Sequence, residues 1–178
     1  LQSIDVDSVL ALTSFTHDVI PAISDLDQFD HMILYVPDKT DCSFVDTTEK
    51  DCDLRGVGPE GLGERTALLL DPGTNGFRLV QIPAYPTNGS VINCSRSIEC
   101  GPDETSLVVQ ESLSLNGYVA GWTRGNLKEY DAGSYDQWYR RMFGESLGNI
   151  VVRSCVVSNL YDNSRPLLVR IDYENRFA

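Results

Sequence analysis

The sequence contains 178 residues, enough for one ordinary domain or two small ones. Hydrophobic residues make up 42% and charged residues 22%, which is typical of a globular chain and excludes a disordered one. The formal net charge of −12 would repel a phosphate backbone, which argues against nucleic-acid binding and favours solubility. The sequence has no apolar run long enough to span a membrane.

The start of the chain resembles neither a signal peptide nor an initiation site. Residues 1–8 have no basic start and no apolar stretch, and the first residue is not Met. We therefore expect the sequence to be an excised fragment or a mature segment.

Strand patterns dominate the first half of the chain. Apolar β-branched runs and alternating residues predict strands at residues 9–15, 31–36, 43–46, 67–70 and 77–82. A loop is expected at 16–28, and the glycine-rich segment 56–63 requires unusual backbone angles. Asn75-Gly76 supports a hairpin between the last two strands.

A domain boundary is predicted near residue 84, where Pro83, Pro86 and Asn88-Gly89 interrupt the regular pattern. Beyond it, we predict strands at 91–99, 107–115, 150–157 and 167–173. One helix is expected after Ser134, because Gln137 completes a capping box with it. The predicted core of this part consists of Leu107, Val109, Leu113, Leu115, Trp138, Met142, Val169 and Ile171.

The five cysteines do not form a zinc-binding pattern, because none stands in a CxxC pair. Cys42/Cys52 and Cys94/Cys100 each flank a short polar segment. Two local disulfides and a free Cys155 would fit an export compartment, whereas five ordinary thiols are the alternative. An acidic loop with Asp38, Asp41, Asp51 and Asp53 has no EF-hand spacing, so we predict a solvated loop and no metal site.

The candidate catalytic residues are His31 and Asp46. His31 begins a predicted strand, and Asp46 ends the next one, fifteen residues later. If these strands pair, the Asp can accept the imidazole N–H, fix the tautomer and stabilise the imidazolium, while the other ring nitrogen serves a thiol. A surface His and a turn Asp are the alternative interpretation of two single residues.

Around these residues the sequence resembles bacterial transglutaminase-like proteins. Residues 26–37 are similar to their histidine segment, in which a Phe stands two positions before the catalytic His and an apolar strand ends in Pro. Residues 44–49 are similar to their aspartate segment, although the family often has Pro where this chain has Thr47. Residues 59–70 and 78–83 resemble following segments, and 117–120 and 165–168 resemble an attached β-rich domain of unknown function.

The resemblance implies a mostly β (α+β) fold in two parts. Residues 1–84 would be the His/Asp-bearing sheet portion of a transglutaminase-like, papain-like core. Residues 85–178 would form an antiparallel β domain with one helix packed on it. A core lacking its front helix would expose apolar sheet surface, which the fragment either tolerates or covers with a partner chain or by self-association.

In this family the catalytic Cys begins a helix upstream of the first strand, so the nucleophile would lie outside this sequence. Cys42 and Cys52 follow the His strand and have acidic neighbours that disfavour a thiolate. The other three cysteines belong to the second half. The resemblance therefore implies that His31 transfers protons and Asp46 orients it, in a fragment that is inactive alone.

The expected parent is a cysteine enzyme that transfers an acyl group to an amine or to water, with a peptide or protein substrate and no cofactor. We expect a periplasmic or secreted location. A rival hypothesis is a non-catalytic exported β-rich binding or scaffold module with a vestigial triad, whose exposed aromatics, Trp122 among them, could contact a partner. Core packing is the alternative use of Trp122 and Trp138.

Overall fold

The computed structural model describes residues 8–37, 44–52, 58–71, 76–85, 89–102, 105–147 and 149–176. Packing divides the chain into two compact units. The first unit contains residues 1–50 and 54–89, and the second contains 51–53 and 90–178. The main segment of the second unit begins after Gly89, five residues beyond the boundary predicted at residue 84.

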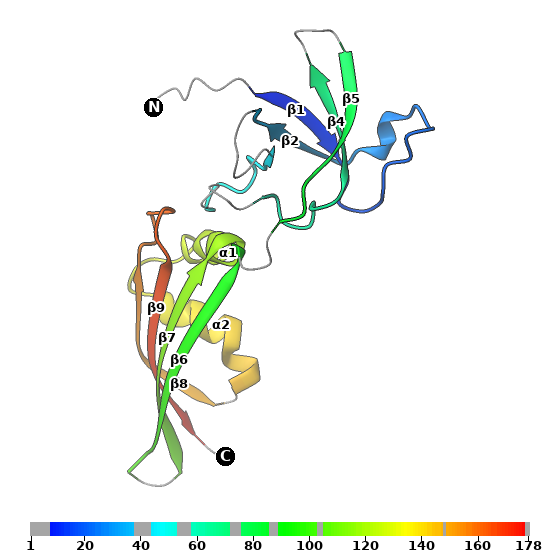
Figure 1. Cartoon of the computed structure of the whole chain (residues 1–178). Coiled ribbons are helices and arrows are strands. Elements are labelled where there is room, and N and C mark those ends of the chain that lie inside the picture. Colours follow the sequence, from blue (N-terminus) through cyan, green and yellow to red (C-terminus); the bar gives the residue numbers. More distant parts are fainter. Residues whose placement is uncertain are drawn as a thin grey trace. The chain divides into compact units, whose positions relative to one another are not determined.

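The first unit is built on a five-stranded antiparallel sheet (Figure 1). The strands lie in the order β3-β2-β1-β4-β5, and β1 pairs with β2 on one side and with β4 on the other. A single 3-10 turn, η1, interrupts the loop between β1 and β2. The elements are β1 (Val9–Thr13), η1 (Leu26–Gln28), β2 (His31–Tyr35), β3 (Phe44–Val45), β4 (Thr66–Asp71) and β5 (Gly76–Gln81).

One face of this sheet carries the core of the first unit. Because side chains alternate along a strand, Ala11, Ile33 and Leu69 point to the same face, and all three are buried. The segment after position 58 adds Leu62 to this core, and Ile82 follows β5. Gly61 adopts a φ of 75°, in the left-handed region, so the glycine-rich loop does contain an unusual backbone angle, as predicted.

The opposite face of the sheet is apolar but largely open. Leu10, Met32, Phe77 and Leu79 are exposed there, and Met32 retains 53% of its accessible surface. The cross-strand pairs place them together, since Leu10 lies opposite Leu70, which in turn lies opposite Phe77. The apolar surface expected for this part of the chain is therefore present on a single sheet face.

The second unit is a four-stranded antiparallel sheet in the order β6-β7-β9-β8, with two α-helices. Helix α1 continues directly from the end of β7, and α2 packs along the sheet, where it contacts β8 (Figure 1). The elements are β6 (Val91–Cys100), β7 (Ser106–Asn116), α1 (Gly117–Leu127), α2 (Tyr135–Leu147), β8 (Ile150–Ser158) and β9 (Leu167–Arg176).

The predicted core of the second unit is confirmed. Period-two alternation on β7 and β9 and helical spacing on α2 direct these side chains to the same interior. Val109, Leu115, Trp138, Val169 and Ile171 are buried in one cluster. The remaining three predicted residues, Leu107, Leu113 and Met142, are partly buried against it.

Helix α1 corrects the prediction of a single helix. Gly117, Gly121 and Gly125 recur every four residues along it, and glycine is among the weakest helix formers, so its sequence does not indicate a helix. Gly121 instead serves packing. A Cβ on Gly121 would stand 2.1 Å from Sγ of Cys52, so the glycine allows the segment at Asp51 and Cys52 to pack directly on the helix.

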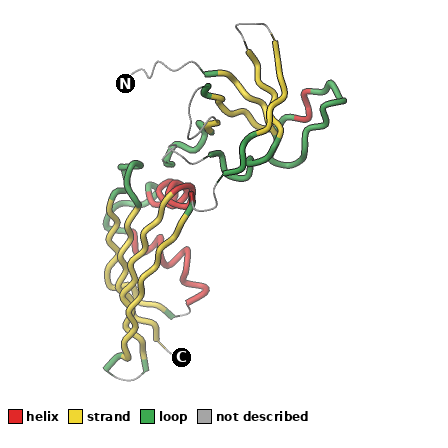
Figure 2. The backbone as a smooth tube through the Cα atoms, viewed as in Figure 1, coloured by secondary structure: helices red, strands yellow, loops and turns green. Residues whose placement is uncertain are grey.

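The fold class is mostly β with a minor helical content, as predicted (Figure 2). No helix in the described part of the chain is long and apolar enough to cross a bilayer. Of the two alternatives for Cys94 and Cys100, the structure excludes a disulfide between them, because both are free and both lie on the extended strand β6. Six residues of strand span about 20 Å, whereas a disulfide needs Cα atoms within about 7 Å. A Cys42–Cys52 bond involves Cys42, which lies outside the described residues.

Candidate functional site

The pairing of β2 with β3 brings His31 and Asp46 together. His31 is the first residue of β2, and Asp46 directly follows β3. Leu34 lies opposite Val45, so the same register sets Asp46 beside Ile33, on the face that His31 shares. Nε2 of His31 stands 2.7 Å from Oδ2 of Asp46. The two candidate residues thus form a hydrogen-bonded pair at the end of a strand.

The Asp46 carboxylate is buried and fully engaged. Only 5% of its side chain is exposed, against 17% for His31. Its second oxygen, Oδ1, accepts hydrogen bonds from the backbone N–H of Thr48 at 2.9 Å and from the Thr48 hydroxyl at 2.7 Å. Burial raises the pKa of Asp46, but the hydrogen bonds from Thr48 and His31 outweigh it, so the net pKa lies below the ordinary value.

An ionised Asp46 determines which ring nitrogen of His31 carries the proton. A carboxylate can only accept, so Nε2 must donate, and in the neutral imidazole Nδ1 is then the unprotonated nitrogen. Among the described residues, none hydrogen-bonds Nδ1. The arrangement leaves a base available on the side of the ring away from Asp46.

Phe15 packs against the imidazole. The two ring centroids are 4.4 Å apart with planes tilted by 47°. Phe15 follows the end of β1, where Thr13 pairs with His31. Gly61 also lies close to the phenyl ring, because a Cβ built there would stand 3.8 Å from Phe15 carbons. His31 is therefore bounded by Asp46 on one side and by an aromatic ring on another.

Asp30, the residue before His31, fixes the turn that carries Phe15. Its Oδ1 accepts from the backbone N–H of Phe15 at 2.8 Å. Its Oδ2 accepts from the hydroxyls of Ser14 at 2.9 Å and Thr16 at 2.6 Å. The Thr16 hydroxyl and the Phe15 N–H lower the pKa of this carboxyl far below the usual range.

Ser14, His17 and Asp30 have the residue types of a serine triad but not its geometry. In a triad the carboxylate binds the histidine and the histidine binds the serine. Here the carboxylate accepts from the Ser14 hydroxyl directly, while His17 Nδ1 lies 2.9 Å from the Thr16 hydroxyl and 3.3 Å from that of Ser14. Because the Ser14 hydroxyl donates its proton to Asp30 and not to His17, the cluster holds the turn after β1 in place and does not activate a nucleophile.

Sequence reasoning missed Asp30, Ser14 and Phe15 as neighbours of the site. Asp30 adjoins His31, but its partners stand about fifteen residues earlier and are recognised only once β1 and β2 pair. Thr48 was detectable, because a hydroxyl two residues after an Asp is a common local partner for its carboxylate.

The described cysteines all belong to the second unit, so none shares a unit with His31. Cys155 is half-buried on β8, and burial raises the pKa of its thiol to about 11, the opposite of what a nucleophile needs. Of the acidic loop residues, Asp51 pairs with Lys128, whereas Asp38, Asp41 and Asp53 lie outside the described residues. No metal-binding cluster occurs in the described part of the chain.

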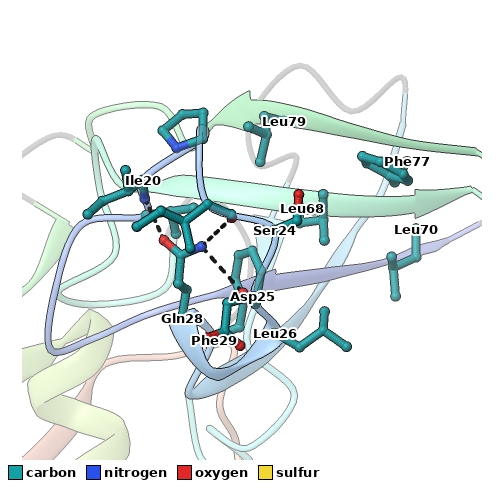
Figure 3. Close-up of a pocket in the computed structure, with 13 residues that line it drawn as sticks. Ile20, Ser24, Asp25, Leu26, Gln28, Phe29, Leu68, Leu70, Phe77 and Leu79 are labelled. Carbon is teal, nitrogen blue, oxygen red and sulfur yellow. Dashed lines mark hydrogen bonds between the residues drawn. The ribbon is translucent and has the colours of Figure 1, made fainter.

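A second feature of the first unit is an apolar pocket of about 360 Å³ (Figure 3). The loop that includes η1 forms one wall, and the open sheet face of β4 and β5 forms the other. The Gln28 side chain fixes the loop: its Oε1 accepts from Ile20 N–H and its Nε2 donates to the carbonyl of Ile23, both at 2.7 Å. Leu68, Leu70, Phe77 and Leu79 line the sheet side.

Comparison with family models, with curated proteins and with solved structures finds no match for this chain.

Proposed function

We propose that the first unit carries the His/Asp half of a cysteine-dependent acyl-transfer site. Supporting this is the pair itself, in which a buried, ionised carboxylate accepts the Nε2–H of His31 at 2.7 Å, so that Nδ1 is the unprotonated nitrogen of the neutral ring. A histidine so held can take a proton from a thiol and return it to a leaving amine. The transglutaminase-like resemblance of residues 26–37 and 44–49 points to the same chemistry.

In the proposed reaction, Nδ1 of His31 takes the thiol proton and the resulting thiolate attacks an amide carbonyl. A C–S bond forms, the C–N bond breaks, and His31 returns the proton to the departing amine, which leaves a thioester. An incoming amine or water then attacks the thioester, loses a proton through His31 and releases the thiol. Asp46 remains a carboxylate and stabilises the imidazolium throughout.

The thiol in this scheme comes from polypeptide other than the described cysteines. Cys52 is buried against helix α1, and the high pKa of Cys155 disfavours its thiolate. The chain alone is thus proposed to be inactive on amides.

Chemical complementation tests this proposal. The chain is supplied with a small thiol and an activated ester, and thiol-dependent acyl transfer is measured near neutral pH. We expect His31→Ala to abolish the protein-dependent rate and Asp46→Asn to lower it by about 10²- to 10⁴-fold, because the wrong tautomer is then favoured. His17→Ala is the matched control, since His17 is the other histidine of the chain. Equal losses in the two histidine variants would contradict the proposal.

The apolar pocket supports a second candidate of a different class, a non-catalytic binding module in which the His/Asp pair is vestigial. Its volume of about 360 Å³ and its mainly apolar lining with a few polar groups are the properties of a ligand-binding pocket. Figure 3 shows the side chains of the loop and of the two strands around this space. Such a pocket would take an apolar group.

Binding of an environment-sensitive apolar dye distinguishes this second candidate. Saturable binding at one site per chain, lost in Phe77→Ser, would support it. Phe77 is highly exposed, so its replacement should not unfold the unit. Tyr161→Ser is the control, because Tyr161 is similarly exposed but lies in the second unit. Equal dye binding by both variants would exclude the pocket.

A further inference from the structure

We propose that Asp30 is a positioning residue for His31, which it controls by fastening the turn that holds Phe15 against the imidazole. This role deepens the proposed acyl-transfer function and rests on it. No part of the transglutaminase-like resemblance assigns a role to Asp30 or to Phe15.

The turn after β1 is held from a single carboxylate. Asp30 accepts hydrogen bonds from the Phe15 N–H and from the hydroxyls of Ser14 and Thr16. Ser14 is only 1% exposed, so its hydroxyl needs a partner within the protein. Asp30 itself is exposed, and its orientation therefore depends on these bonds and not on packing.

Phe15 transmits this anchoring to the catalytic ring. The Phe15 side chain is exposed, so burial of apolar surface contributes little to holding it in place. Its ring centroid nevertheless lies 4.4 Å from that of His31. An aromatic ring at this distance covers one face of the imidazole and restricts rotation about its χ2 angle. Restricted rotation favours the single orientation in which Nε2 meets Asp46.

Asp30 also adjoins His31 in sequence, so its charge could act on the ring directly. Among the described residues, Asp46 after β3 is the charged group bonded to the ring, and Asp30 is the adjacent residue in the chain. His17, in the turn after β1, contacts the hydroxyls of Thr16 and Ser14. Asp30 directs both of its oxygens to the turn, and the structure assigns it no bond to the imidazole. The test must therefore separate the contact through Phe15 from a simple charge effect.

Nuclear magnetic resonance of the complete chain provides that test, with two signals of His31. The ring-current shift of its carbon-bound protons reports the Phe15 contact, and solvent exchange of its Nε2–H reports the bond to Asp46. We expect Asp30→Ala to lose the ring-current shift and to accelerate the exchange by about tenfold, as local opening becomes easier. Phe15→Ala should accelerate the exchange to a similar extent, although it keeps the Asp30 charge.

The control is Asp25→Ala, which removes another exposed carboxylate that accepts a backbone N–H, in this case that of Asp27. It should change neither signal. Asp30→Asn should give an intermediate exchange rate, because its amide oxygen can still accept the Phe15 N–H. Unchanged exchange in Phe15→Ala would overturn the proposal, and so would a retained ring-current shift in Asp30→Ala.

These measurements need neither thiol nor substrate, so their outcome is independent of the complementation assay. If the signals respond as expected but complementation shows no dependence on His31, the proposed function is wrong, whereas the role of Asp30 and Phe15 in orienting the His31 ring is supported. If complementation depends on His31 but Phe15→Ala exchanges like the unmodified chain, only the positioning role fails.

Discussion

Asp46 receives hydrogen bonds from Thr48 as well as from His31, and Thr48 alone supplies both bonds to Oδ1. We predict that Thr48→Val lowers the free energy of unfolding of the first unit by about 1 kcal/mol near pH 7, because one hydrogen bond to the carboxylate is lost. Thr47→Val is the control, since Thr47 is exposed like Thr48 but is not the residue that bonds Asp46 Oδ1. Urea unfolding followed by circular dichroism measures both.

The same residue gives a pH dependence with a definite sign. The pKa of Asp46 is lowered in the folded state, so the ionised carboxylate stabilises the fold. This contribution is complete above the ordinary carboxyl pKa of about 4 and is lost as the pH falls through the lower folded value. The difference between the unmodified chain and Thr48→Val should therefore shrink below about pH 4. A constant difference down to pH 2 would show that Thr48 does not act through the Asp46 charge.

The cysteines differ in accessibility in a way that alkylation can measure. Cys94 and Cys100 are exposed on β6, whereas burial raises the pKa of Cys155 to about 11. At pH 8 we predict that Cys155 is alkylated about a hundredfold more slowly than a thiol at the model-peptide value, because the thiolate is the reacting form. Peptide mapping after timed labelling gives the rates. Labelling of Cys155 as fast as Cys94 would contradict its burial.

At the level of elements, α1 is held by close backbone packing and by a buried arginine. Arg124 is 1% exposed and donates to the main-chain carbonyls of Asn159, Asp162 and Arg165. Its guanidinium fork can reach several carbonyls at once, which a lysine could not do. The helix therefore connects the sheet to the loop between β8 and β9.

The helical glycines give a paired prediction. Gly121→Ala should destabilise the second unit by about 1–3 kcal/mol, because its new Cβ would stand 2.1 Å from Sγ and 3.0 Å from the backbone N of Cys52. Gly125→Ala meets Asp51 Oδ2 at an ordinary 3.5 Å, so it should be neutral or stabilise by up to about 1 kcal/mol through helix propensity. Tryptophan fluorescence during urea unfolding measures both, and equal effects would contradict the packing.

The strands were predictable because local pattern and tertiary packing agree in them. Alternation predicted β7 and β9 together with their buried faces, and the apolar run at 31–36 predicted β2. Helix α1 was not predictable, because its glycines weaken the helical pattern and satisfy a tertiary contact. Helix propensity does not predict α1, because the free energy of tertiary packing outweighs the propensity differences between residues.

The candidate site divides in the same way. His31 and Asp46 were identified from their places on two predicted strands and from the resemblance, and their 2.7 Å hydrogen bond follows from the pairing of β2 and β3. The contact of Phe15 with His31 depends on the pairing of β1 with β2 and on the anchor at Asp30. Neither the Phe15–His31 contact nor the Asp30 anchor can be predicted from local sequence, because each joins residues about fifteen positions apart.

For the whole molecule, the two units have separate hydrophobic cores, and both tryptophans, Trp122 and Trp138, belong to the second. We predict that tryptophan fluorescence reports unfolding of the second unit alone, whereas circular dichroism reports both. Gly121→Ala should then shift the fluorescence transition, and Thr48→Val should leave it in place. An equal shift of the fluorescence midpoint by Thr48→Val would show that the units unfold as one.

The outer strand β6 has a further consequence for how the chain behaves in concentrated solution. Among the described strands it pairs only with β7, so one row of its amide and carbonyl groups is without a strand partner. Ile92 and Ile98 are exposed on it, and Arg96, bound to the buried Glu111, stands between them. A lone edge of this kind can template fibril growth, and a mid-strand cation opposes it. High ionic strength screens the repulsion between the Arg96 side chains of two approaching edges. Turbidity should therefore develop first in solutions stored at high ionic strength.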